Sequence, residues 1–284
     1  MIKLCAFADE YATEFDEQIK GLVKNGIKLI ELRSADGKNV ADFTDEDARL
    51  CRDKLADNGI KVWSVGSPIG KIDIDADFDE YEKTVRRVYE TAVILGADKI
   101  RMFSFFNAYG KREKVMEQLG RIVAIGGEYG VKAYHENEKD IYGDTVERVV
   151  DLMDSVKGLY HVYDPANFIQ CGQDSRTAIE TLFEREGYFH VKDVVKATGE
   201  LVPAGYGDGL IDVILEKLKG RDAVMTLEPH LTLFTGYKAI DNTELKTKFH
   251  FGKTEEAFDF AVASMKALLE RCGYKKTENG YKAD

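Results

Sequence analysis

Four side chains that could bind a metal ion each follow a strand-like run in the second half of the chain. They are Glu136 after Lys132-Ala133-Tyr134-His135, Asp164 after Val162-Tyr163, His190 after Tyr188-Phe189, and Glu228 after Val224-Met225-Thr226-Leu227. A buried carboxylate is costly unless it is paired or coordinates a metal. Three carboxylates and one imidazole form a mainly oxygen donor set that suits Mn²⁺ or Mg²⁺, with Zn²⁺ and Co²⁺ as alternatives. The pattern predicts one divalent ion, with Mn²⁺ favoured.

Any one of these residues, taken alone, reads more simply as a polar strand end or a helix cap. Their recurrence at four successive strand ends is what favours a metal site. Such a site requires a fold that brings the ends of consecutive strands to one place. The rest of the chain therefore has to be read for that arrangement.

Glycines divide the chain into alternating strands and helices. Gly26, Gly59 and Gly130 each end a helix-like segment and precede an apolar run, as glycine at a helix C′ position does. The predicted strands lie near 2–8, 27–33, 60–66, 98–104, 131–136, 159–164, 187–192 and 223–228. The predicted helices lie near 13–25, 44–58, 77–95, 111–129, 144–156, 174–186, 209–219 and 254–272, with N-caps at Thr44, Asp77, Asp144, Asp174 and Thr254.

Strands that alternate with helices imply right-handed crossovers and a parallel sheet. Eight units in a chain somewhat above the typical ~250 residues predict an α/β fold, a single (β/α)₈ TIM barrel. An open doubly wound sheet is the alternative, and it lacks a Gly-x-Gly-x-x-Gly motif after the first strand. We assign residues 1–274 to the barrel and residues 275–284 to a polar, peripheral C-terminal tail.

Two predicted loops at the C-terminal face of the barrel, where such folds keep their active sites, are unusually long. One follows strand three at 66–73, and the other follows strand eight at 229–253. The second contains Phe234, Tyr237 and Phe249. Long loops with aromatic residues at this face are typical of lids or subunit contacts. We expect the second loop to cover the mouth and to supply aromatic contacts to a ligand or to a neighbouring subunit.

Composition narrows the classes of partner. The 284-residue chain carries a net charge of −11, which argues against a nucleic-acid-binding surface. Its four cysteines lie far apart without a C-x-x-C pair, and a reducing cytoplasm is the simplest setting for them. No apolar run approaches the roughly 18 residues of a spanning helix. We expect a cytoplasmic protein with a small-molecule ligand and no nucleic-acid or membrane partner, and a homo-oligomer is left open.

The strand-end segments resemble a known family. They are His135-Glu136-Asn137-Glu138, Tyr163-Asp164-Pro165-Ala166-Asn167, Phe189-His190-Val191-Lys192-Asp193 and Leu227-Glu228-Pro229-His230. In order, they resemble the xylose-isomerase-like barrels of the sugar phosphate isomerase/epimerase family, and the loop segment at 67–71 is similar too. The resemblance implies that Glu136, Asp164, His190 and Glu228 bind the metal and that Glu136 and Glu228 move protons. Asn167 departs from the His that free-ketose epimerases tend to carry, which speaks against free-ketose 3-epimerisation.

The chemistry of such a site is consistent with this resemblance. A C–H beside a sugar carbonyl is too weak an acid for an unaided carboxylate, but a bound metal can stabilise the enediolate. Two carboxylates on opposite sides of the carbon can then act as base and acid. We expect a metal-dependent isomerase or epimerase of a small sugar or sugar phosphate. The alternatives are an inosose-type dehydratase and a non-catalytic sugar-binding barrel; a DNA-repair endonuclease would need more than five histidines and a basic surface.

Four further residues are predicted to contact the substrate: Glu31, Asn167, Lys192 and Lys71. Lys192 shares a strand face with His190, and Glu31 shares one with Arg33. The alternative for each is a solvated or salt-bridged residue of the barrel wall. That alternative is favoured for both Arg33 and Lys71, and it is about as well supported as substrate contact for Glu31 and Lys192. Arg101 cannot be assigned to either role from the sequence.

Overall fold

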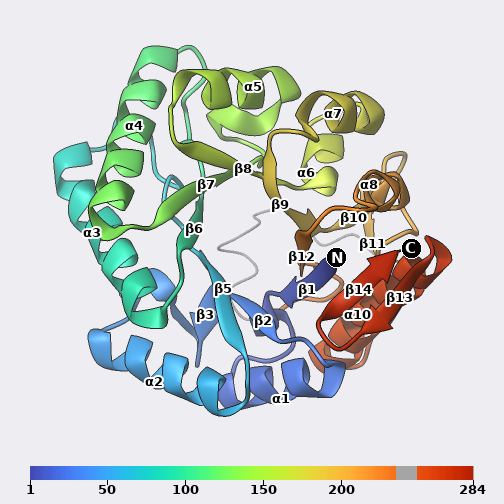
Figure 1. Cartoon of the computed structure of the whole chain (residues 1–284). Coiled ribbons are helices and arrows are strands. Elements are labelled where there is room, and N and C mark those ends of the chain that lie inside the picture. Colours follow the sequence, from blue (N-terminus) through green and yellow to red (C-terminus); the bar gives the residue numbers. More distant parts are fainter. Residues whose placement is uncertain (235–247, 284) are drawn as a thin grey trace.

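The protein folds as a closed parallel barrel surrounded by helices (Figure 1). The structure is a computed structural model that describes residues 1–234 and 248–283. Neighbouring barrel strands follow the order of the sequence, and the last strand pairs with the first in parallel, from Ile2–Ala223 to Ala6–Leu227. The barrel strands are β1 (Ile2–Ala6), β2 (Leu29–Leu32), β5 (Lys61–Gly66), β6 (Lys99–Met102), β7 (Lys132–Glu136), β8 (Leu159–Tyr163), β9 (Glu186–Val191) and β12 (Ala223–Leu227).

The helices form the outer layer and confirm the predicted alternation (Figure 1). They are α1 (Phe15–Asn25), α2 (Asp45–Asp57), α3 (Phe78–Leu95), α4 (Arg112–Tyr129), α5 (Val146–Ser155), α6 (Pro165–Gln170), α7 (Ser175–Leu182), α8 (Ile211–Lys217) and α10 (Thr254–Arg271). The short helix α6 was not predicted. Within the described residues, no helix combines the length and the apolar character that a membrane crossing needs.

Side chains along the strands alternate between two apolar clusters. Leu4 and Ala6 of β1 join the large core between strands and helices, whereas Cys5 belongs to a small separate cluster with Tyr134 and Tyr188. Because neighbouring residues of a strand point to opposite faces, the small cluster fills the barrel interior. Charged residues occupy the same interior closer to the C-terminal ends of the strands, and the candidate site is built there.

The predicted helix starts are correct in three of five cases. The side chains of Thr44, Asp77 and Asp174 accept hydrogen bonds from backbone N–H groups in the first turns of α2, α3 and α7. The predictions for Asp144 and Thr254 were wrong by one residue. Thr145 and Lys253 hold the N-cap positions, and Asp144 instead pairs with Arg148 at 2.5 Å.

Residues 275–283, expected to form a polar, peripheral tail, are mostly exposed but form regular structure that the sequence did not predict. These residues form most of a hairpin of β13 (Tyr274–Thr277) and β14 (Gly280–Ala283), and β14 pairs antiparallel with β1 through Tyr281 and Ile2. β2 pairs with β1 only from Cys5 onward, which leaves the edge at Ile2 open to the hairpin. Two further hairpins, β3 (Ser34–Ala35) with β4 (Lys38–Asn39) and β10 (Asp193–Val195) with β11 (Glu200–Val202), were not predicted either.

Gly70 fixes the loop after β5 against the next strand end. Its φ is +87°, and a Cβ placed on it would lie 2.1 Å from the carbonyl oxygen of Phe103. Gly96 has a similar φ of +74° but open space around it. We expect Gly96→Ala to cost about 1 kcal/mol for the left-handed conformation, and Gly70→Ala to cost a further ~1–3 kcal/mol because backbone must move. Urea unfolding of both variants checks this; equal costs would contradict it.

Candidate metal centre

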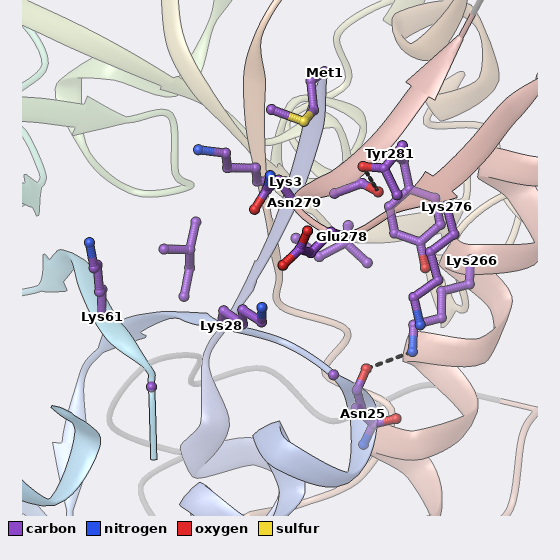
Figure 2. A pocket seen from close by; sticks show the side chains of 16 residues that line it. Met1, Lys3, Asn25, Lys28, Lys61, Lys266, Lys276, Glu278, Asn279 and Tyr281 are labelled. Carbon is purple, nitrogen blue, oxygen red and sulfur yellow. Dashed lines mark hydrogen bonds between the residues drawn. The ribbon is translucent and has the colours of Figure 1, made fainter. Parts of the chain in front are cut away.

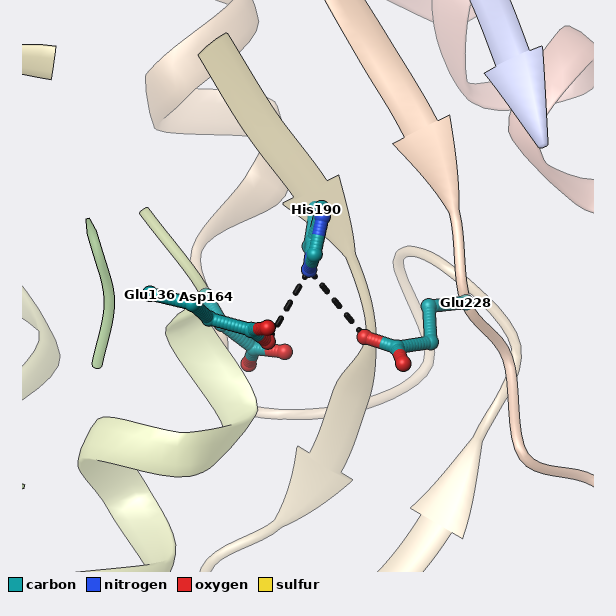
Figure 3. Close-up of side chains that lie close together, drawn as sticks. All are labelled: Glu136, Asp164, His190 and Glu228. Carbon is teal, nitrogen blue, oxygen red and sulfur yellow. Dashed lines mark hydrogen bonds and ion pairs between the residues drawn. The ribbon is translucent and has the colours of Figure 1, made fainter. Parts of the chain in front are cut away.

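Glu136, Asp164, His190 and Glu228 come together at the mouth of the barrel. One donor atom from each lies within 4.8 Å of all the others, and all four side chains are buried. Nδ1 of His190 lies 3.0 Å from Oε1 of Glu136 and 3.1 Å from Oε2 of Glu228. Figure 3 shows Glu136 and Asp164 approaching from one side and Glu228 from the other, with the imidazole between them. The four predicted ligands therefore form one compact cluster.

This cluster has the chemistry of a divalent metal site. Oδ1 of Asp164 caps α6 by accepting from the backbone N–H of Asn167 at 2.8 Å, so this residue is a helix cap as well as a candidate ligand. Its other oxygen, Oδ2, and Oε2 of Glu228 accept no hydrogen bond from any described residue, although both are buried. Burial raises the pKa of Asp164 to about 7, and the nearby Glu136 and Glu228 add to the effect. A divalent cation would satisfy these oxygens and oppose that shift.

The imidazole of His190 is held in the orientation that a ligand needs. Its Nε2 lies 3.3 Å from Oε2 of Glu31, on the side of the ring away from the other carboxylates. The hydroxyl of Tyr188 donates to the second oxygen of Glu31 at 2.8 Å. With a metal in place of the Nδ1 proton, a proton on Nε2 shared with Glu31 would leave the Nδ1 lone pair directed toward the cluster, which is how metal-binding histidines are commonly oriented. In this structure Glu31 contacts His190, and its predicted role in substrate binding stays a prediction.

Two arginines, neither of them assigned to the site from the sequence, flank the two glutamates. Arg33 donates hydrogen bonds to both oxygens of Asp9, at 2.8 and 2.9 Å, and to Oε1 of Glu228 at 2.9 Å. Nε of Arg101 lies 3.1 Å from Oε2 of Glu136. The guanidinium of Arg33 stacks over the Phe7 ring at 4.3 Å. Arg33 is salt-bridged, as the alternative reading expected, but to a residue of the cluster.

The other predicted substrate contacts lie around the same cluster. The ammonium of Lys192 donates to Oδ1 of Asn167 at 2.7 Å and lies 3.5 Å from Oδ2 of Asp164. Asn167 in turn donates to Oε1 of Glu136 at 3.4 Å. Lys71 is farther out, 3.5 Å from Glu138 and 4.4 Å above the Phe103 ring. The structure thus brings Asn167 and Lys192 to the cluster and places Lys71 at a neighbouring carboxylate.

The ionisable groups around the cluster carry more negative than positive charge, which favours a bound cation. Through ion pairs, the mouth links four cations to seven carboxylates: Arg33, Arg101, Lys71 and Lys192 to Asp9, Glu10, Glu31, Glu136, Glu138, Asp164 and Glu228. Buried charge without compensation is unfavourable. A divalent ion would remove most of the excess negative charge.

A second group of potential ligands shares Glu228. Donor atoms of Glu10, Glu228 and His230 also lie within 4.8 Å of one another. Arg33, however, already donates to Oε1 of Glu228 and lies 3.7 Å from Oε1 of Glu10. This guanidinium supplies the positive charge on that side, so the group that contains His190 is the better candidate for a divalent ion.

Only part of the loop after β12 is described. The ring of Phe234 is buried, 5.6 Å from the His230 ring and 5.2 Å from the Arg33 guanidinium. Phe249 packs on the rings of Tyr206 and Phe260, and Tyr237 lies outside the described residues. Phe234 therefore lies beside the cluster, while the loop's role as a lid or subunit contact stays a prediction.

Comparisons with known proteins agree with the fold and with the family. Solved structures of similar fold include L-ribulose 3-epimerase, with a TM-score of 0.74, 16% identity and coverage of 96% of both chains. Others are the probable 3-DHS dehydratase AsbF from Bacillus anthracis (TM-score 0.71, 16% identity, 93% of this chain and 98% of that one) and the IOLI protein with a binding zinc atom (0.72, 16%, 95% and 98%). No curated protein matches the sequence. The model of one family, described as Xylose isomerase-like TIM barrel, matches residues 19–248. The chain belongs to the xylose isomerase-like TIM barrel family.

Proposed function

We propose that this protein is a divalent-metal-dependent isomerase or epimerase of a small sugar or sugar phosphate. The observation that carries the proposal is the position of two glutamates on opposite sides of one candidate metal site. Glu136 ends β7 and Glu228 follows β12, and both reach Nδ1 of His190 within 3.1 Å. A substrate carbon held between them would have a carboxylate on each side.

The bound ion, with Mn²⁺ favoured, would supply the Lewis acidity that makes a C–H beside a carbonyl acidic enough to lose its proton. Glu136, Asp164, His190 and Glu228 would hold it. Glu136 and Glu228 would also exchange protons with the substrate carbon. Protonation on the opposite face gives epimerisation, and protonation at the neighbouring carbon gives aldose–ketose isomerisation.

The basic groups around the cluster would keep both glutamates ready for proton transfer. Burial acts to raise the pKa of Glu228, but His190, His230 and Lys192 hold it well below its usual range. For Glu136, His190 and Arg101 likewise outweigh burial and lower the pKa. In the metal-free protein His190 is itself protonated, because Glu136, Glu31 and Glu228 outweigh burial and raise its pKa well above the usual range. A bound cation would replace the Nδ1 proton and would likewise favour the ionised glutamates. Each glutamate would then be a weak base when ionised and a strong acid after it accepts a proton. A strong acid returns the proton readily to the enediolate.

The cations of the mouth support a substrate with negative charge or many hydroxyl groups. Lys192 and Asn167 lie at the metal cluster, and Lys71 lies near Glu138. We propose that Lys192 and Asn167 hydrogen-bond substrate hydroxyls and that Lys71 approaches a phosphate or a distal hydroxyl. Four free cysteines are consistent with a reducing cytoplasm as the site of action.

A screen by solvent deuterium exchange would test this proposal. The Mn²⁺-loaded protein is incubated in D₂O with ketoses, aldoses and their phosphates, and incorporated deuterium is read by NMR. We expect exchange at the carbon beside the carbonyl of at least one sugar, and no exchange with the Glu136→Gln/Glu228→Gln double variant. Absence of exchange across the panel, with the metal shown to be bound, would favour the non-catalytic sugar-binding alternative.

A dehydratase is the second candidate. The observation that favours it is the cluster of cations at the mouth, since Lys192 and Arg101 suit a substrate whose enolate carries additional negative charge. Dehydration begins with the same proton removal and then expels a hydroxyl group. Inososes and related cyclic hydroxyketones in the same screen separate the two activities. An unsaturated ketone that absorbs in the ultraviolet would identify the dehydratase.

Glu31 gives a prediction about positioning. Its carboxylate contacts Nε2 of His190, so Glu31→Gln should weaken the orientation of the imidazole without removing a ligand. We expect Mn²⁺ affinity to fall about 10- to 100-fold, the range seen for such supporting groups. Turnover should recover largely at saturating Mn²⁺. Metal titration by calorimetry measures the affinity, and Tyr188→Phe, which removes the donor to Glu31, should show a smaller effect in the same direction. Turnover that stays low at saturating Mn²⁺ would instead point to direct contact with the substrate.

A further inference from the structure

A second cavity lies at the opposite, N-terminal face of the barrel. It has a volume of about 510 Å³ and lies between β1, the start of β2, α10 and the C-terminal hairpin. The hairpin creates it, because β14 pairs with the beginning of β1 whereas β2 joins β1 only from Cys5 onward. The lining includes Leu4, Leu29 and Tyr281. A volume of this size is typical of sites for small molecules.

Lysines surround this cavity. Figure 2 shows Lys3, Lys28, Lys61, Lys266 and Lys276 around its opening, from elements far apart in the sequence. Glu278 is the one acidic residue in the lining, which consists of described residues. The whole chain has a net charge of −11, so a local excess of positive charge runs against its composition.

Most of these lysines have no partner within the described parts of the chain. No hydrogen bond or ion pair is formed there by the ammonium groups of Lys3, Lys28, Lys61 and Lys276, all of which are exposed residues. Lys266 is the exception, since it donates to the carbonyl oxygen of Asn25 at 2.6 Å. Burial lowers the pKa of Lys266, and the charge of Lys276 adds to the effect, in keeping with a positive potential in the cavity.

These lysines follow a pattern in the sequence that the site at the mouth does not use. Lys3, Lys28 and Lys61 each lie at or just before the start of a barrel strand, in the runs Ile-Lys-Leu, Ile-Lys-Leu and Ile-Lys-Val. Lys99 and Lys132 begin β6 and β7 in the same way, but they lie over the rings of Trp63 and Tyr160. Among the described residues, Lys3, Lys28 and Lys61 are thus the strand-start lysines without such a ring contact, and they line the cavity.

Neutralisation of helix ends is the competing explanation. The C-terminal ends of the helices gather at this face of the barrel, and their carbonyl groups favour nearby cations. Lys266 does this for α1, because its ammonium group donates to the carbonyl oxygen of Asn25, the last residue of that helix. The other four lysines make no such contact among the described residues, so helix ends do not account for their convergence on the cavity.

We propose that this cavity binds a small organic molecule that carries a diphosphate or triphosphate group. Several converging ammonium groups match the charge of a polyphosphate, and the apolar part of the lining would accommodate the organic portion. A long polyanion such as a nucleic acid would extend beyond the cavity and be repelled by the acidic remainder of the surface. Because the site lies at the face opposite the metal cluster, the proposal does not depend on the proposed function.

Binding of ADP and of inorganic triphosphate to the metal-loaded protein would test the proposal, with adenosine as the uncharged control. We expect saturable binding of one or both, weakened by added salt. Lys28→Gln/Lys276→Gln should weaken it about 10- to 100-fold, since each lost contact is worth roughly three- to tenfold. Lys28→Arg/Lys276→Arg should restore it, and Glu278→Gln should strengthen it. Lys83→Gln, on the exposed surface of α3, is the matched control and should change nothing.

The metal site requires its own control because polyphosphates chelate metals. Binding to the cavity should be unchanged in His190→Ala. The proposal would be overturned if neither probe binds at about 1 mM, or if binding is lost in His190→Ala and kept in the double lysine variant. Circular dichroism and thermal melting of each variant confirm that the fold is intact.

Discussion

Glu228→Gln is expected to leave most of the metal bound and to lower turnover by about 10²–10⁴-fold, the usual loss for a missing acid–base group. Glutamine keeps the length of the side chain and one oxygen that can face the ion. Its NH₂ group would take the place of Oε1, which accepts from Arg33 at 2.9 Å, so this one hydrogen bond is lost. The change thus removes the basic carboxylate with little loss of packing. Bound manganese and deuterium exchange, measured on the same sample, separate the two effects.

Glu138→Gln is the matched control for this prediction. Glu138 is a buried carboxylate at the same mouth, but its contact is with Lys71 rather than with His190. The control should retain both metal and exchange to within a few fold. Normal metal content together with exchange at the wild-type rate in Glu228→Gln would make Glu228 a ligand only, and the two-carboxylate mechanism would fail.

The barrel could be predicted because the signals for it are local. Helix-ending glycines and apolar runs set each strand–helix unit, and eight such units admit few topologies. The hairpin of β13 and β14 could not be predicted in this way. Its residues are mainly polar, and what orders them is an edge of β1 left open by the late start of β2. That edge is a property of the closed barrel, not of the tail's own sequence.

The four candidate ligands were found because each lies at a strand end, and all strand ends of a barrel meet at one mouth. The same rule would place Asp9 and Glu10, which follow the first strand, at the mouth. The sequence, however, does not show which residue pairs with them. Arg33 illustrates why. Its side chain joins Asp9 from the end of β1 to Glu228 from the end of β12, and such a pairing across the barrel depends on side-chain direction.

The role of Glu31 shows a second limit. Sequence alternation correctly places it inside the barrel, but alternation cannot separate a residue that faces a ligand from one that supports a ligand-binding side chain. The structure shows that Glu31 contacts Nε2 of His190 and the hydroxyl of Tyr188. These contacts depend on which ring nitrogen faces the cluster, which no sequence pattern encodes.

His190→Ala should give the opposite result to Glu228→Gln: the metal is lost first, and turnover falls as a consequence. Nδ1 of His190 is the one nitrogen donor in the group, and it lies between Glu136 and Glu228. Its removal should lower Mn²⁺ affinity by more than about 100-fold, since even supporting residues cost 10- to 100-fold.

Activity of His190→Ala should therefore return in part when Mn²⁺ is raised, because both proton-transferring glutamates are still present. His250→Ala, which changes an exposed histidine, is the matched control and should keep wild-type affinity. Calorimetric titration with Mn²⁺, followed by exchange assays at rising metal concentration, gives both quantities. If His190→Ala binds Mn²⁺ as tightly as the wild type, the ion does not lie at this cluster. If it binds Mn²⁺ weakly and saturating metal restores no exchange, the imidazole takes part in the chemistry itself, and the division between metal-holding and proton-transferring residues would have to be redrawn.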